Sequence, residues 1–179
     1  MLSLIIILML LYAVYTGVRR GFVLQMVYTV GYFLVFWVAQ TLSHTLGPKL
    51  SLLVPYPSAT EDSYFAFFQK STGLSLDKAF YVGVAFLIVM FIGGLLVRLV
   101  GLLANSLTYL PLLKQFNKLL GGLLSLVVVY IGIFLFLYVL ALVPIDGLQN
   151  TLAHSWVAKT MVLKTPILTS QITQWWVAG

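Results

Sequence analysis

Side chains that could carry out acid–base chemistry or bind a metal are few in this sequence. The two histidines, His44 and His154, are 110 positions apart, and neither has a carboxylate or a second histidine at ligand spacing. Glu61 and Asp62 are adjacent, so on a regular backbone they point in different directions and would not form an acid–base pair. The chain has no cysteine, which excludes thiolate catalysis and disulfides.

Catalytic sequence motifs are also missing. No G-x-S-x-G, phosphate-binding glycine loop or H-E-x-x-H occurs. An enzyme would need the stretch 43–78 or the tail to gather serine, histidine and acidic groups at one place. We therefore expect a protein that is not an enzyme and that holds no metal and no cofactor.

The most distinctive charged feature is the stretch GVRRGF, which contains the one adjacent pair of basic residues, Arg19 and Arg20. Uncharged apolar runs flank it, and one helix over 1–42 would be about 63 Å long, twice the thickness of a hydrocarbon core. The chain must therefore reverse near residue 20. Gly21 supplies backbone freedom, and the arginines stay at the membrane surface because each would cost about 2.5–3.5 kcal/mol at mid-bilayer. We predict that Arg19, Arg20, Gly21 and Phe22 orient and pack this hairpin.

The composition explains why a membrane is the expected solvent. Of 179 residues, 61% are hydrophobic and 8% are charged, whereas a soluble domain is about 25% charged. The formal net charge is +6. The basic residues are scattered over helix ends and loops, which is typical of membrane orientation and of contact with anionic lipid, and not of nucleic-acid binding.

The apolar pattern predicts an all-α integral membrane protein with four transmembrane helices and additional amphipathic interfacial helices. The expected parts of the four-span domain, residues 1–143, are spans at about 1–18, 22–42, 79–97 and 119–143, and an amphipathic extension at 98–113. Between the second and third spans, residues 43–78 are expected to form a loop on the membrane surface, with the aromatic cluster Tyr64 to Phe68 at the interface.

The remaining residues, 144–179, are predicted to form an extracytoplasmic amphipathic tail. Pro144 and Gly147 break the preceding helix. Leu148, Leu152 and Trp156 are spaced four apart and are expected on one helical face. Trp175 and Trp176 suit the level of the lipid headgroups.

Sidedness depends on the position of the basic residues, since their number is five on each side. One side holds Arg19, Arg20, Arg98, Lys114 and Lys118, and the other holds Lys49, Lys70, Lys78, Lys159 and Lys164. The arginine pair directly follows the first span, which usually dominates orientation. We expect the arginine turn in the cytoplasm and both termini outside.

A stripe of small and polar residues runs along the third helix. Its members are spaced by 4, 3, 4 and 3 positions, which places them on one helical face: Gly94, Arg98, Gly101, Asn105 and Thr108. Small residues allow close helix contact, so the stripe fits a helix–helix or subunit interface. The alternative is a polar path in which Arg98 faces an anion or a lipid headgroup.

Three stretches together give the sequence a recognisable order. GVRRGFVLQMVYTVGY precedes FNKLLGGLLSLVVVYIG at the fourth span and LQNTLAHSWVAKTMVLKTPILTSQI in the tail. This order resembles the colicin V production protein family, and the tail resembles Gram-positive members. Asn117 and Lys118 stand where many members have Asp-Arg, and Ser125 replaces a glycine. Gly121 and Ser125 still form a small-xxx-small pair.

The resemblance implies a multi-pass protein of the bacterial cytoplasmic membrane that is involved in toxin production and envelope homeostasis. We therefore predict a non-enzymatic accessory or scaffold protein. Its expected partners are a bilayer with anionic lipid, and a second copy or other envelope proteins, but no nucleic acid. The start of the fourth helix would be set by Asn117, Lys118, Gly121 and Ser125. The alternative is an oligomeric channel or transport component, with the Gly94–Thr108 face lining a polar path.

Overall fold

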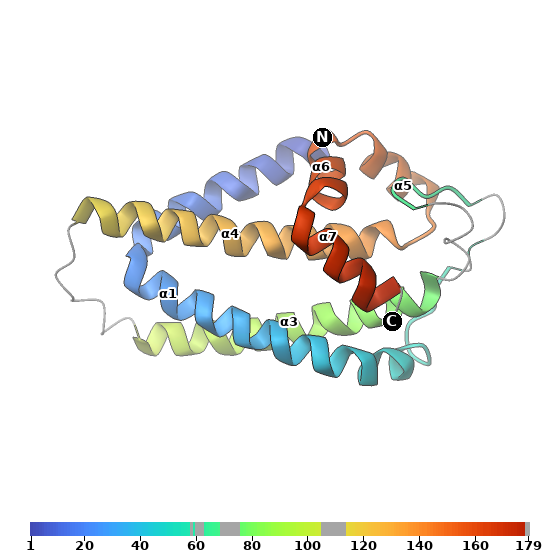
Figure 1. Ribbon diagram of the computed structural model, residues 1–179, viewed down its shortest axis with the longest axis horizontal. Helices are drawn as coiled ribbons and strands as arrows, with labels where there is room; N and C mark the ends of the chain where they lie inside the picture. Colours follow the sequence, from blue (N-terminus) through green and yellow to red (C-terminus); the bar gives the residue numbers. More distant parts are fainter. Residues whose placement is uncertain (58, 60–62, 69–75, 105–113, 178–179) are drawn as a thin grey trace.

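The structure is a computed structural model that describes the chain except residues 58, 60–62, 69–75, 105–113 and 178–179 (Figure 1). All regular elements of the described part are helices, as the composition predicts. In chain order they are α1 (Leu2–Leu50), α3 (Leu76–Ala104), α4 (Lys114–Ala141), α5 (Asp146–Ala153), α6 (Trp156–Lys164), α7 (Pro166–Ile172) and the π-helix η2 (Thr173–Val177).

Helix α1 is bent sharply at Gly21. This residue has φ 78° and ψ 170°, and no other described residue has a positive φ. A side chain is strongly disfavoured in that conformation, whereas glycine adopts it readily. In Figure 1 the first arm of α1 runs from the N-terminus toward the left end of the molecule and the second arm runs back toward the right, so the chain doubles back at the bend. The predicted reversal near residue 20 is confirmed.

The long helices form two pairs. The first arm of α1, residues 2–20, packs on α4, and the second arm, residues 22–50, packs on α3. The pairs meet at the bend and diverge away from it, and α7 crosses between them (Figure 1). A 19-residue arm is about 28 Å long, close to the thickness of a hydrocarbon core.

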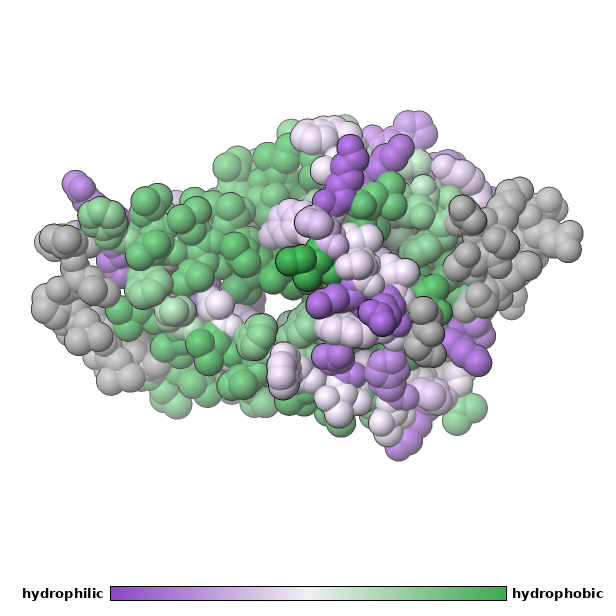
Figure 2. All heavy atoms as spheres, in the orientation of Figure 1, coloured by the Kyte–Doolittle hydropathy of each residue, from purple (hydrophilic) through white to green (hydrophobic). Residues whose placement is uncertain are grey.

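Among the described residues, three helices are long and apolar enough to cross a membrane: Leu2–Leu50, Leu76–Leu103 and Gln115–Ala141. We call the part near the bend the bare half: residues 7–34 of α1, 91–104 of α3 and 115–127 of α4. Its outward side chains are mainly large and apolar, and Figure 2 shows this end covered by hydrophobic residues. A surface of this kind marks a contact with a membrane or another protein, and the length and hydropathy of the three helices favour a membrane.

The other end carries what we call the cap, made of α5, α6, α7 and η2. The cap packs on α1, α3 and α4, and together with their ends (36–50, 76–90 and 129–141) it forms the capped half. Its core contains fully buried aromatic side chains, among them Phe86, Phe134 and Tyr138. Polar side chains gather over this half in Figure 2.

The tail differs from the expected interfacial helix. Helix α5 ends at Ala153, and Ser155 starts α6 by accepting a hydrogen bond from the Ala158 backbone N–H. Leu152 is therefore buried whereas Trp156 is 68% exposed, so the prediction that they share a face is wrong. Trp176 does not face outward but lies in the core, with its ring centre 5.4 Å from that of Phe86 and 5.6 Å from that of Tyr138.

The expected loop 43–78 also needs correction at its beginning. The helix continues to Leu50, because Ser43 is buried and Gly47 packs against the backbone of Val82 on α3. In the aromatic cluster, Phe65 is buried in the core instead of lying at the interface. Helix α4 begins at Lys114, five residues before the expected span, and α3 is continuous to Ala104.

Candidate functional site

The first arm of α1 and α4 come together backbone against backbone at their glycines. A Cβ atom on Gly121 would lie 2.6 Å from the Gly17 carbonyl oxygen and 2.7 Å from the Gly21 carbonyl carbon. On the other side of the contact, a Cβ on Gly17 would collide with Gly121 and Ser125. Backbones this close exclude any side chain. The predicted residues Gly21, Gly121 and Ser125 therefore lie together at one crossing, with Gly17 as a further member.

Asn117 completes this crossing at the bend. Its Oδ1 accepts a hydrogen bond from the Phe22 backbone N–H at 2.6 Å. Because Gly21 is not helical, Phe22 begins the second arm and its N–H lacks a partner within the helix. Asn117 therefore acts as a cap supplied from a distant helix, and an uncharged amide is sufficient for this role.

The arginine pair lies at the surface of the bend. Arg20 places its guanidinium carbon 4.5 Å from the centre of the Tyr28 ring. Arg19 lies over Tyr15, with its Nη1 3.4 Å from the Tyr15 hydroxyl. Both arginines are exposed, as is Lys118 on α4. The bend thus carries three exposed cations.

The stripe on α3 faces the second arm of α1. Gly101 packs directly under Tyr28, and a Cβ on Gly94 would lie 3.4 Å from Tyr32. Arg98 is exposed, and it lines a shallow cavity of about 170 Å³ together with Tyr32 and Gly94. The other two predicted members, Asn105 and Thr108, lie outside the described residues.

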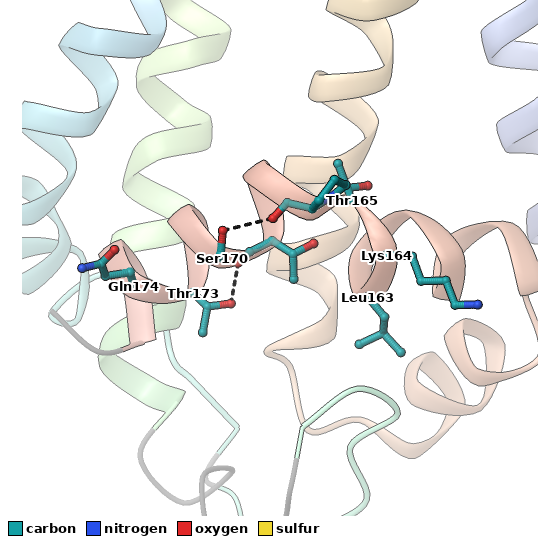
Figure 3. A pocket seen from close by; sticks show the side chains of 8 residues that line it. Leu163, Lys164, Thr165, Ser170, Thr173 and Gln174 are labelled. Carbon is teal, nitrogen blue, oxygen red and sulfur yellow. Dashed lines mark hydrogen bonds between the residues drawn. The ribbon is translucent and has the colours of Figure 1, made fainter.

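A larger groove lies at the junction of α6 and α7 (Figure 3). Its volume is about 650 Å³, and it is lined by Leu163, Lys164, Thr165, Pro166, Thr169, Ser170, Thr173 and Gln174. The junction forms because Pro166 disfavours a helical conformation at Thr165, which is extended with ψ 100°. Pro166 then begins α7, a position that proline favours.

The threonine hydroxyls of the groove are used to hold α7 in place. Thr165 donates to the Met161 carbonyl, so the Tyr130 hydroxyl is the donor in its 2.7 Å bond to Thr165. Thr173 donates to the Thr169 carbonyl, so the Tyr138 hydroxyl donates to Thr173 in the same way. Both tyrosines belong to α4. Helix α4 is therefore hydrogen-bonded to the two ends of the groove, at Thr165 and at Thr173.

Ser170 also donates to backbone, toward the Pro166 and Ile167 carbonyls. The remaining polar groups of the lining are the Lys164 ammonium and the Gln174 amide. The groove therefore offers a ligand one positive charge, on Lys164, and the N–H donors of the Gln174 amide. Both suit a ligand with an acidic group.

No described residues form a group of three or more His, Asp or Glu side chains that could hold a metal ion. His154 ends α5, with its Nδ1 2.7 Å from the Asn150 carbonyl oxygen, and His44 is exposed on the second arm. Glu61 and Asp62 lie outside the described residues.

Our sequence prediction missed the groove. Thr165, Thr169 and Thr173 are spaced four apart, which places three hydroxyls on one helical face. That spacing was the available signal. The tyrosine partners on α4 could not be found this way, because the contacts join residues 35 positions apart.

The fold and these contacts define a polytopic all-α membrane protein with a helical cap. The chain belongs to the colicin V production protein family, which matches residues 2–166. It is also 30% identical over 176 residues to the transmembrane protein YshB of Bacillus subtilis (strain 168), covering 98% of this chain and 97% of YshB. No solved structure matches the chain.

Proposed function

We propose that the protein is a non-enzymatic scaffold of the bacterial cytoplasmic membrane that acts in toxin production and envelope homeostasis. Four membrane crossings hold the cap at the outer surface, and the groove at α6 and α7 docks an acidic segment of an envelope partner. The two arms of α1 are two of these crossings. Each is long enough to span, and the bend that separates them carries cations that stay out of hydrocarbon.

The rigid attachment of the cap carries this proposal. Two hydrogen bonds from tyrosines of α4 hold the cap. In addition, the Ser3 and Ser155 hydroxyls lie 2.9 Å apart and join the start of α1 to the start of α6. Trp176 anchors η2 in the core. A groove fixed to the membrane helices at several points suits a docking platform, because little ordering free energy is lost on binding.

Docking can be tested by filling the groove without changing the core. Ser170 is exposed in the lining, whereas Thr160 is exposed on α6 outside it. We expect Ser170→Trp to abolish rescue of a deletion strain in bacteriocin secretion and envelope-stress assays, at normal protein levels. Thr160→Trp should rescue fully. Full rescue by both variants would refute docking at the groove.

The proposed sidedness places Lys118 in the cytoplasm and Ser170 outside. Because the chain lacks cysteine, Lys118→Cys and Ser170→Cys each give a single labelling site. An impermeant thiol reagent applied to intact cells should label only the second variant. Labelling of Lys118→Cys alone would invert the topology.

The channel alternative is less well supported, because the two described glycines of the stripe, Gly94 and Gly101, are buried against the second arm of α1. Gly101 lies under Tyr28, so lining a pore with this face would require the second arm of α1 to move away. We expect liposomes containing the purified protein to show no ion flux above protein-free liposomes. Flux that Arg98→Ala alters would overturn the scaffold proposal.

A further inference from the structure

The cavity beside Arg98 has the features of a lipid site. Its lining joins one guanidinium with mainly apolar side chains from α3 and α1: Tyr32, Met90, Phe91, Gly94, Leu95 and Arg98. Phe91 is 70% and Leu95 46% exposed, so the cavity opens toward the surrounding hydrocarbon. From Met90 to Arg98 is about 12 Å along the helix axis. A groove of that length accommodates several carbons of an acyl chain below the arginine.

The charge of Arg98 has no acidic partner among the described residues. The two described acids, Asp77 and Asp146, belong to the capped half, at the opposite end of the bundle. Arg20 lies at the same end as Arg98, stacked on Tyr28, whose ring covers Gly101 one turn beyond Arg98. No described acid lies at this end, so an anion from outside the described chain has access to Arg98.

The position of Arg98 narrows the class of anion. It lies six residues before the described end of α3, about 9 Å along the helix. Its long stem can carry the guanidinium to the lipid phosphates. A guanidinium binds phosphate oxygens in a bidentate manner, and basic pockets between membrane helices suit anionic headgroups.

We propose that this cavity binds one anionic phospholipid, with the phosphate on Arg98 and an acyl chain along Gly94 and Leu95. The absence of a side chain at Gly94 makes room for the chain, and Tyr32 forms the opposite wall. The site is independent of the scaffold function and of the sidedness proposed above, since it needs only the bilayer and this seam between α1 and α3.

Native mass spectrometry of the detergent-purified protein tests the site, with phosphatidylglycerol and phosphatidylcholine of identical acyl chains as probes. We expect phosphatidylglycerol to be retained by the wild-type protein and to bind about tenfold more weakly to Arg98→Gln, because a charge-assisted contact is lost. Arg98→Lys should recover part of the affinity. Gly94→Val should weaken retention too, since it fills the cavity.

Lys118→Gln is the matched control, because it removes an exposed cation at the same end but outside the cavity. It should leave retention within about twofold of wild type. Equal weakening by Lys118→Gln and Arg98→Gln would overturn the proposal in favour of general attraction. Retention of phosphatidylcholine equal to that of phosphatidylglycerol would also overturn the proposal. Displacement of the bound phosphatidylglycerol by water-soluble glycerol phosphate would overturn it as well. Size-exclusion profiles and thermal midpoints establish that each variant is folded.

Discussion

Two buried glutamines show how differently the two halves of the molecule are held together. Gln149 in the capped half donates to the Ala141 and Val143 carbonyls and accepts from the Ala66 N–H. Gln25 in the bare half is also buried, yet its Oε1 accepts no hydrogen bond from the described residues. Hydrogen-bond networks and an aromatic core hold the capped half together. Close contact between helix backbones at glycines holds the bare half together.

With the membrane placement proposed above, the difference follows from the surroundings of each half. In lipid, association of apolar helices gains little from the hydrophobic effect, so close contact at small residues must supply the attraction. At the cap, burial of aromatic rings away from water stabilises the fold by about 25 cal/mol per Å². The following predictions test this contrast, from the largest expected effect to the smallest.

The largest effect is expected at the glycine crossing. Gly121→Leu should abolish folding, because the nearest obstacles are backbone atoms that cannot move aside. Gly132 lies on the same helix, and a Cβ atom added there would meet no described atom within 4 Å, so Gly132→Leu should behave as wild type. Size-exclusion chromatography in detergent measures both. A monodisperse Gly121→Leu protein would disprove backbone proximity as the main contact.

In the capped half, truncation of the aromatic core should cost less but remain severe. Trp176→Ala is expected to lower the free energy of unfolding by about 3–5 kcal/mol, since it leaves a cavity between Phe86 and Tyr138. Trp156→Ala, at a 68% exposed position, should cost little. The thermal midpoints of the two variants, measured by limited proteolysis of the tail at increasing temperature, compare the two effects. Equal midpoints for the two variants would contradict the buried core.

The two glutamines provide a matched pair of substitutions. Gln149→Met should destabilise by about 1–3 kcal/mol, because it leaves buried backbone groups without partners. Gln25→Met should be neutral or stabilising, since it removes a buried oxygen that has no described partner. Denaturant titration of both variants gives the difference. A larger loss for Gln25→Met would show that this side chain has a role outside the described contacts.

The hydrogen bond from the Phe22 N–H to Asn117, at the start of the second arm of α1, is expected to stabilise the fold by about 1–2 kcal/mol. Asn117→Ala should lower stability by that amount because the Phe22 N–H loses its acceptor. Asn117→Asp retains an acceptor oxygen and should restore most of the loss. The thermal midpoints of the three proteins measure the effect. If the aspartate variant is no more stable than the alanine variant, the hydrogen bond is not what stabilises the bend.

The smallest effect concerns alkaline pH. The Tyr56 hydroxyl donates to the Leu142 carbonyl at 2.9 Å, and burial, followed by Asp77 and Tyr81, raises the pKa of Tyr56 to about 12. Its contribution is present below the ordinary tyrosine pKa of about 10 and is lost as the pH rises toward 12. Tyr56→Phe should therefore lose less stability between pH 10 and pH 12 than the wild-type protein loses. An unchanged pH profile would exclude this group.

The bend illustrates how much of the fold could be predicted. The length of the apolar runs required a reversal, and Arg19, Arg20 and Gly21 located it. The residue that accepts the hydrogen bond of the Phe22 N–H at the bend could not be predicted from the sequence. Asn117 could be identified as part of a motif, but its hydrogen bond to Phe22 joins residues 95 positions apart.

The tail illustrates where local periodicity is insufficient. A four-residue spacing placed Leu152 and Trp156 on one face, but the Ser155 cap starts a new helix between them. The interfacial preference of tryptophan placed Trp176 at the headgroups, whereas the cap folds back and buries it between α3 and α4. Aromatic side chains suit both an interface and a core, so composition alone does not separate the two.

By itself the sequence determined the solvent, the helical class and the place where the chain turns, because these depend on local composition, run length and the cost of placing charge in hydrocarbon. Only the tertiary structure decided which glycines touch, which hydroxyls clamp the cap and what lies beside Arg98. Those features arise from helices that are distant in the chain and meet through backbone proximity and shared hydrogen bonds, which no local pattern encodes.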